Sequence, residues 1–176
     1  MSKDNLVIEW LRTHVDAYIP SKAFPTDACM DMKVIVGVIQ DVDRPVGALV
    51  VEQFHDPDGI GKPVNGVHIY PNQSMIFHTG LKCAIPEGYV LKVYVRSSTG
   101  IKKHLTLCNG TGIIDSHYRG EIMVALKNDG SVPQQVCNGD KIVQCALEPV
   151  LDYSNKEVFY LGSTDRGEGG IGSTGK

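Results

Sequence analysis

Residues 110–121 read GTGIIDSHYRGE, and this stretch constrains the fold more than any other in the chain. Alternating apolar residues lead into a turn that holds Asp115, and Tyr118 follows shortly after it. The pattern predicts a β-hairpin with a carboxylate and an aromatic ring at its tip. On its own, Asp115 would be an ordinary turn residue. Whether Asp115 has a catalytic role therefore depends on the other motifs of the chain.

Short apolar runs rich in Val, Ile, Leu and Tyr recur on both sides of this stretch, and turn residues separate most of them. This spacing predicts an all-β domain, built as a sandwich, jelly roll or barrel. Segment 5–19 fits both a helical stripe and strand alternation, and we expect a strand there. The runs are LVIEWL (6–11), MKVIVGVI (32–39), GALVVEQF (47–54), SMIFHTGLKCAI (74–85), YVLKVYV (89–95), HLTLC (104–108), EIMVALKN (121–128), KIVQCALEPV (141–150) and EVFYL (157–161).

Composition narrows the class of protein. The 176 residues suffice for one domain with a core. A formal net charge of −3 argues against binding to nucleic acids or membranes, although it does not exclude a local binding site for a small anion. Five cysteines without a C-x-x-C pair predict reduced thiols. With no signal-peptide pattern and no apolar stretch of membrane-spanning length, we expect a cytoplasmic protein, in the host cytoplasm if the chain is viral.

The segment after Leu161 is rich in glycine, and its composition predicts a disordered tail. Gly167, Gly169 and Gly172 match G-x-G-x-x-G, the fingerprint of dinucleotide-binding folds. That fingerprint needs a strand before it and a helix after it, and this segment offers neither. A Rossmann oxidoreductase is therefore excluded.

A second polar segment, VRSSTG (95–100), places Arg96 beside two serines. An arginine with adjacent hydroxyls and backbone N–H groups can hold a phosphate, although a surface turn explains the segment equally well. Each of these segments is a weak signal by itself. Their order along the chain is specific.

In that order the segments resemble the five motifs of the trimeric dUTPase (deoxyuridine triphosphatase) family. The spacing from Arg96 to Asp115 matches the family without a gap. Five ordered motifs are a far stronger signal than any single glycine pattern. The motifs are TDACMDM (26–32), VRSSTG (95–100), GIIDSHYRGE (112–121), GDKIVQCALEPV (139–150) and DRGEGGIGSTG (165–175), and HTGLKCAIPEGY (78–89) matches the strand that leads into the second.

The resemblance covers residues 20–176 apart from one insertion, which we place within about 36–66. It implies a distorted jelly-roll β-barrel in a single domain, 1–161, and a flexible glycine-rich arm, 162–176, that closes over substrate. Four positions depart from the family pattern: Cys29 and Ser98 replace glycines, Val95 replaces a proline, and Ile171 replaces a phenylalanine.

The resemblance implies Mg²⁺-assisted hydrolysis of dUTP to dUMP and pyrophosphate, which limits uracil in DNA and supplies the precursor of dTMP. Asp115 would orient and deprotonate the water that attacks the α-phosphorus. Asp31 would act on the metal indirectly, through water, or would support the phosphate-binding arginine. The expected phosphate-binding residues are Arg96, Ser97, Ser98, Gln144, Arg166, Gly172 and Ser173.

Base and sugar selection would fall to the hairpin, whose main chain complements the uracil edge and excludes cytosine. Tyr118 would pack beneath the deoxyribose, and Asn109 would hydrogen-bond the base. Ile171 would cover the base by apolar contact without the ring stacking of a phenylalanine, a difference of about 1 kcal/mol. The expected base- and sugar-binding residues are Asn109, Gly112, Ile113, Ile114, Tyr118, Met123 and Ile171.

The family builds its sites between the subunits of a trimer, so the resemblance implies a homotrimer. The hairpin of one chain, the phosphate loop of a second and the tail of a third would combine around dUTP. We expect no nucleic-acid or membrane partner.

We consider three alternatives to the dUTPase interpretation. The deaminase of dCTP shares the fold, but it needs a glutamate where Ala125 stands and an arginine where Ile101 and Lys102 stand, which argues against it. A nucleotide-responsive regulatory protein could use the insertion, including GALVVEQF (47–54), as a partner surface, although Asp115 argues against binding alone. Ile171 and Ser98 could instead suit a modified deoxypyrimidine triphosphate.

Overall fold

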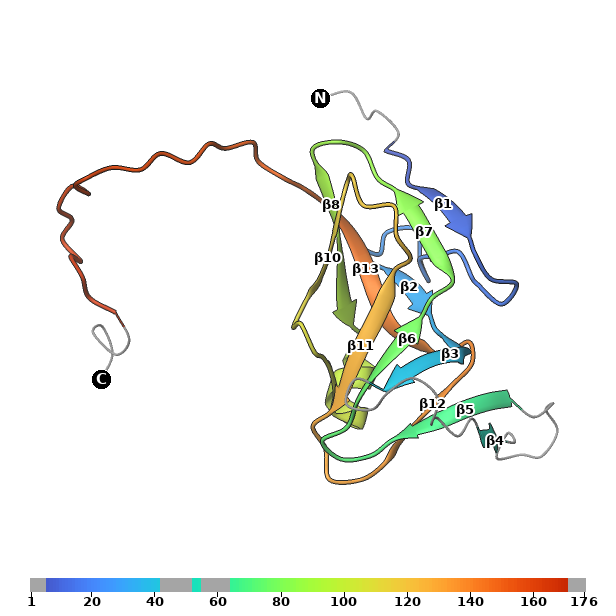
Figure 1. Ribbon diagram of the computed structural model, residues 1–176. Helices are drawn as coiled ribbons and strands as arrows, with labels where there is room; N and C mark the ends of the chain where they lie inside the picture. The colour runs from blue at the N-terminus through green and yellow to red at the C-terminus, as the bar shows by residue number, and fades with distance from the viewer. Residues whose placement is uncertain (1–5, 42–51, 55–63, 171–176) are drawn as a thin grey trace.

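The computed structural model describes residues 6–41, 52–54 and 64–170, and in them the chain is almost entirely β-structure, as predicted (Figure 1). The single helix there has five residues, so no helix in the described part is long and apolar enough to cross a membrane. The elements are β1 Glu9–Arg12, β2 Met30–Lys33, β3 Ile35–Asp41, β4 Glu52–Phe54, β5 Val64–Ile69, β6 Ser74–His78, β7 Leu81–Ala84, β8 Tyr89–Val95, η1 Ser98–Lys102, β9 Leu105–Leu107, β10 Gly112–Asp115, β11 Met123–Asn128, β12 Gln134–Cys137 and β13 Lys141–Pro149.

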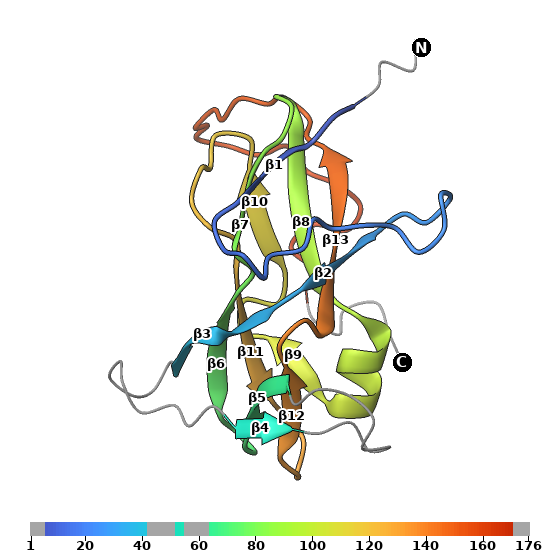
Figure 2. The same cartoon turned by 90° about the vertical axis from the view of Figure 1, so that its right-hand side faces the viewer.

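Two four-stranded antiparallel sheets, with strand orders β10-β8-β13-β2 and β3-β6-β11-β9, enclose the core. A two-stranded sheet, β1-β7, and a three-stranded sheet, β12-β5-β4, extend them. Figure 2 shows β8 beside β13, with helix η1 following β8 at one end of the molecule. This jelly-roll-like arrangement confirms the predicted fold class.

The core follows the two-residue period of the strands. On β6, Met75 and Phe77 are buried while their neighbours are half-exposed, and on β8 Leu91 and Val93 point inward in the same way. Truncating a buried side chain such as Phe77 to alanine would cost about 3–5 kcal/mol. The inner faces of the two large sheets thereby bury one continuous apolar cluster.

The hairpin predicted for residues 110–121 is wrong in one respect. β10 pairs with β8, whereas β11 pairs with β6 and β9 in the other large sheet. The two limbs therefore form a β-arch that crosses between sheets, which we call the β10–β11 arch (residues 112–123). The alternation of apolar and polar residues correctly predicted that both limbs are extended. Which strands pair with the two limbs depends on packing against strands that are distant in the sequence.

The ends of the chain differ in how well the patterns predicted them. The ambiguous segment 5–19 contains strand β1, in which Trp10 pairs with Cys83 of β7. The strand predicted at 157–161 is wrong, because residues 151–168 are exposed and extend away from the sheets (Figure 1). A strand needs a paired neighbour, and within the described part of this chain that segment has none.

The insertion adds a strand to the molecule. β4 is the described end of the GALVVEQF run and pairs with β5, which in turn pairs with β12. A Cβ on Gly66 would lie 2.6 Å from the Phe54 ring, so glycine is what allows that ring to pack there. Apolar runs predicted neither β5 nor β12, since both are short and interrupted by polar residues.

Candidate active site

Residues from three of the motifs meet at one end of the β10-β8-β13-β2 sheet. Asp31 of β2 lies opposite Gln144 of β13, and Arg96 follows the end of β8. Arg96 Nε lies 2.9 Å from Asp31 Oδ1, and Lys141 Nζ lies 3.1 Å from Asp31 Oδ2. Arg96 Nη1 also donates to the Lys141 carbonyl at 3.1 Å. The Asp31 side chain is only 14% exposed, so the carboxylate anchors both cations.

An open, basic cleft of about 420 Å³ lies beside this cluster. Arg96 and Ser98 line it, together with three lysines that sequence reasoning missed: Lys33, Lys103 and Lys141. Lys33 shares the outward face of β2 with Asp31, and this alternation was the available signal. A cleft with this lining attracts an anion such as a polyphosphate.

The two serines after Arg96 lie at the start of helix η1. Ser97 occupies the N-cap, and the Gly100 N–H donates to the Arg96 carbonyl at 2.9 Å. Ser98, which replaces a usual glycine, lies within the helix and does not have a positive φ. The serine is therefore accommodated without backbone strain.

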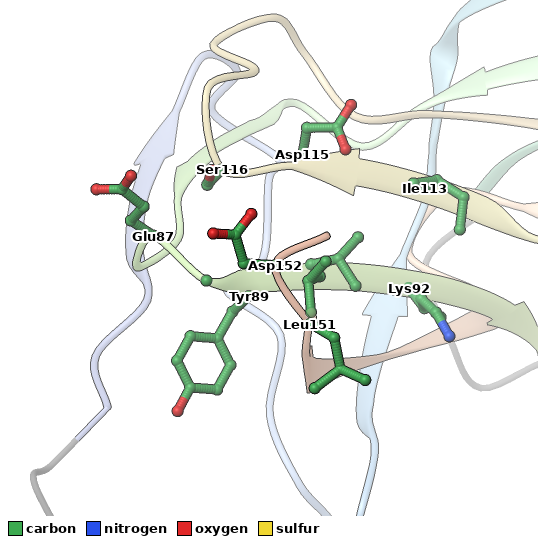
Figure 3. A pocket seen from close by; sticks show the side chains of 11 residues that line it. Glu87, Tyr89, Lys92, Ile113, Asp115, Ser116, Leu151 and Asp152 are labelled. Carbon is green, nitrogen blue, oxygen red and sulfur yellow. The ribbon is translucent and has the colours of Figure 1, made fainter. Parts of the chain in front are cut away.

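Asp115 lines a separate open cleft of about 620 Å³, formed by the start of β8, the end of β10 and the chain after β13 (Figure 3). Glu87, Asp152 and Lys92 line the same cleft. Lys92 is already engaged, because its Nζ lies 2.7 Å from Glu148 Oε2. In the described part of the chain, no basic side chain pairs with Asp115, so its exposed oxygens can accept hydrogen bonds from water.

Neither cleft contains a ready-made metal cage. Among the described residues, no group of three or more His, Cys, Asp or Glu is placed to hold a metal ion. Mg²⁺ commonly binds through one or two carboxylates, several waters and substrate phosphates. The donor chemistry of Asp31, beside a cleft suited to phosphates, fits such an ion.

A single chain does not bring Asp115 and Arg96 together. Asp115 pairs with Val90, and Arg96 lies six residues further along the chain. At roughly 3.3 Å per residue, the separation is about 20 Å. The register also places Asp115, Lys92, Tyr94, Gln144 and Asp31 on one face of the sheet, so the predicted catalytic and phosphate-binding groups lie at opposite ends of that face.

The predicted base- and sugar-binding residues surround the β10–β11 arch. Gly112, Ile113 and Ile114 lie on β10, with Ile113 exposed and Ile114 packed partly on the core. Asn109 is exposed before β10, and Met123 is 52% exposed at the start of β11.

Tyr118 packs against Gly120, because an added Cβ there would collide with the tyrosine ring and hydroxyl. Its hydroxyl donates to the Glu121 carbonyl at 2.9 Å. The tyrosine therefore stays beside the arch, with 41% of its surface exposed.

Arg166, the one predicted tail residue that the structure describes, lines neither cleft. Arg166 is exposed, and its Nε donates to the Gly169 carbonyl at 2.9 Å. Ile171, Gly172 and Ser173 lie outside the described residues.

Comparisons with known proteins identify the family of the chain. A family model described as dUTPase matches residues 64–175. The deoxyuridine 5'-triphosphate nucleotidohydrolase of Roseobacter denitrificans is 38% identical over 113 residues, 64% of this chain and 74% of that protein. The enzyme of the same name from Desulfotalea psychrophila is 43% identical over 107 residues, 61% of this chain and 71% of that protein.

Solved structures show the same fold. A variant dUTPase of Staphylococcus bacteriophage 80alpha, with dUpNHpp, superposes with a TM-score of 0.73 at 21% identity, over 97% of this chain and 99% of that chain. The dUTPase from phage phi11 of S. aureus, whose structure visualizes a species-specific insert, gives 0.65 at 21% identity, over 90% and 99%. From its sequence match and its relatives, the chain belongs to the dUTPase family.

Proposed function

We propose that this protein is a cytoplasmic dUTP diphosphatase that converts dUTP and water to dUMP and pyrophosphate. Such an enzyme limits uracil in DNA and supplies the precursor of dTMP. The observation that carries the proposal is Asp115, at the end of β10, lining an open cleft in a chain of the dUTPase family.

Asp115 is the residue we assign to the attacking water. Its carboxylate is exposed, and no cation in the described ranges pairs with it. A carboxylate in this state can orient a water for attack on the α-phosphorus and accept its proton. No covalent intermediate is required.

Phosphate binding falls to the cluster around Arg96. Asp31 orients the Arg96 guanidinium through their 2.9 Å contact, and Ser97, Ser98 and Gln144 supply polar side chains nearby. Arg166, Gly172 and Ser173 would join from the tail. Positive charge placed at the departing pyrophosphate lowers the barrier by electrostatic stabilisation.

Magnesium fits this arrangement as the cofactor, with Asp31 acting through a bound water. When bound, the ion neutralises charge on the phosphate oxygens. Asp31 also holds Arg96 and Lys141, so it would position these two cations beside the metal-bound phosphates.

Base recognition is assigned to the β10–β11 arch. Main-chain groups of Gly112, Ile113 and Ile114 complement the uracil edge, and Asn109 hydrogen-bonds the base. A cytosine amino group would leave buried partners unpaired, which gives strong discrimination. Tyr118 and Met123 bound the sugar and base, and Ile171 covers the base from the tail.

A homotrimer with shared sites accounts for the separation of about 20 Å between Asp115 and Arg96 along β8. Asp115 of one chain would act on phosphates held by Arg96 of a neighbour. The segment after β13 supports this assembly, because its large apolar side chains are exposed and would gain from burial against another chain. These side chains are Leu151, Tyr153, Val158, Phe159, Tyr160 and Leu161.

The test is pyrophosphate release with Mg²⁺ from dUTP, dCTP, dTTP, UTP and 5-substituted dUTP analogues, with Asp115→Asn as the control. Selective turnover of dUTP that the variant loses is the expected result. Preference for an analogue would point to Ile171 and Ser98 as selectivity residues. Binding of dUTP without turnover would contradict the enzyme and favour the regulatory alternative.

A further inference from the structure

The returning limb of the β10–β11 arch, residues 118–122, is not part of a strand. Its two flanking strands belong to different sheets, so no hydrogen-bond ladder joins them across the arch. Main-chain hydrogen bonds anchor only the two ends of the limb: the Tyr118 N–H donates to the Asp115 carbonyl at 3.0 Å, and the Ile122 N–H donates to the Leu81 carbonyl at 2.9 Å. Side chains must therefore hold the rest of the limb in place.

Glu121 makes the central contacts. Its Oε1 accepts the Gly80 N–H at 2.7 Å, and its Oε2 lies 3.0 Å from His78 Nδ1. An ionised carboxylate only accepts hydrogen bonds, so the ring nitrogen donates. The side chains of His78 and Glu121 are 22% and 23% exposed, which shields this pair from competing water.

The same limb carries groups of the proposed nucleoside site. The Glu121 carbonyl accepts the Tyr118 hydroxyl at 2.9 Å. His78 and Met123 are direct partners in the β6–β11 register, so their side chains lie on the same face of the sheet. A change at His78 thus reaches Tyr118 through Glu121 and reaches Met123 through direct adjacency.

We infer that His78 is a positioning residue of the nucleoside site: with Glu121 it fixes the returning limb of the arch and so places Tyr118 and Met123 against the sugar and base. The inference rests on the proposed function. In the proposed mechanism, His78 contacts neither the attacking water nor the phosphates. Its loss should therefore weaken nucleoside binding and leave the hydrolytic step almost unchanged.

The chain offers a matched control. His68 Nδ1 lies 3.3 Å from Glu52 Oε2, with the two side chains 30% and 41% exposed, in the three-stranded sheet β12-β5-β4. This is the same kind of pair, although more exposed, and it lies away from the arch. His68→Leu should leave the nucleotide kinetics unchanged.

The experiment compares His78→Leu, His78→Gln and His68→Leu in the full chain. His78→Leu should raise KM for dUTP and Kd for dUMP about tenfold, with kcat within about twofold, because a hydrogen bond to a charged group is lost. His78→Gln retains an N–H donor and should recover most of the affinity. A fall in thermal stability without a change in KM would mean a structural role only and would overturn the inference.

Amide hydrogen exchange separates this inference from the function it rests on. Exchange in residues 118–122 should accelerate in His78→Leu and stay unchanged in His68→Leu, whatever the substrate. If the wild-type protein neither binds dUMP nor hydrolyses dUTP, the proposed function is wrong. Unchanged exchange of residues 118–122 in His78→Leu would separately show that the His78–Glu121 contact does not hold the limb. Should His78→Leu not fold, Glu121→Gln, which keeps the shape and weakens the His78 contact, must show the same KM increase.

Discussion

Asp31 and Asp115 are two carboxylates on one face of the same sheet, with opposite surroundings. Asp31 is largely buried and is held by Arg96 and Lys141, whereas Asp115 is exposed at the end of β10. A carboxylate that anchors two cations orients the groups around it. A carboxylate without such partners can accept a proton from water. The residue environments therefore support the different roles proposed for the two.

Thiol reactivity provides a test at the residue scale. Burial raises the pKa of the Cys145 thiol to about 12 and also raises the pKa of Cys83. Cys108 is exposed and adjoins Asn109. Iodoacetamide at pH 8 should therefore modify Cys108 in the folded protein while Cys145 stays unmodified, because the thiolate is the nucleophile.

Peptide mass mapping would measure both sites over time, with and without dUMP. We expect dUMP to protect Cys108, because the base would bind to the neighbouring Asn109. Equal modification of Cys108 and Cys145 in the native protein would contradict the burial of Cys145, and a lack of protection would weaken the placement of the base.

At the scale of single elements, Gly80 links β6 to β7 in a backbone conformation that favours glycine. Its φ is +65°, and an added Cβ would lie 2.7 Å from Ile35 Cδ1 and 2.9 Å from Ala17 Cβ. Gly80→Ala should reduce the free energy of unfolding by about 2–3 kcal/mol, combining backbone strain with overpacking. Gly88 has a φ of +80° and nothing within 4 Å of an added Cβ.

Gly88→Ala should therefore cost only about 1 kcal/mol, from backbone strain alone. Urea denaturation of both variants separates the two contributions. Similar losses in the two variants would mean that the Gly80 surroundings relax and that crowding does not matter there.

A polar cluster on the outer face of β8 and β13 predicts a pH dependence of stability. Lys92 Nζ and the Tyr94 hydroxyl both donate to Glu148 at 2.7 Å. The hydrogen bond from Lys92, followed by that from Tyr94, lowers the pKa of Glu148 from its ordinary value of 4.5. A lowered folded-state pKa stabilises the protein above the unfolded value, and this stabilisation is lost as pH falls through the folded value.

Glu148→Gln should consequently lower the Tm at neutral pH, and the difference from the wild type should shrink as pH falls below 4.5. The hydrogen bond to Glu148 raises the pKa of Lys92 from 10.5. The stabilisation that comes from Lys92 is therefore complete below pH 10.5 and is lost only as pH rises through the higher folded-state pKa. Calorimetry from pH 3 to 7 measures the difference. A constant difference across that range would contradict the assignment.

At the scale of the whole molecule, the described part of one chain does not assemble a site in which Asp115 reaches the Arg96 cluster. In a trimer with shared sites, Asp115→Asn and Arg96→Ala subunits should complement each other, because some sites receive an intact residue from each. Random reassembly of an equal mixture should restore about one quarter of wild-type activity.

The mixture is denatured, refolded together and assayed for pyrophosphate release, with each variant refolded alone as the control. No recovery in the mixture would mean that Asp115 and Arg96 act from the same chain. The tail boundary at 161/162 and the roles of Ile171, Gly172 and Ser173 stay predictions.

The sequence by itself determined the class of the fold, the order of the motifs and the chemistry available to them. Two-residue alternation is a local property, so runs such as 89–95 and 121–128 predicted β8 and β11 well. The sequence also determines the spacing of the motifs around Arg96 and Asp115, because spacing depends only on residue identity and order.

Only the tertiary structure decided which limbs pair, how far apart the charged groups lie and what holds the arch. Apolar residues at 157–161 match a strand pattern, yet no described strand pairs with them. Contacts such as that of Glu121 with His78 join residues 43 positions apart, and packing alone brings the three lysines of the basic cleft together from three separate stretches of the chain. Hydrogen bonding and burial between distant segments depend on the whole folded chain, so no local pattern encodes them.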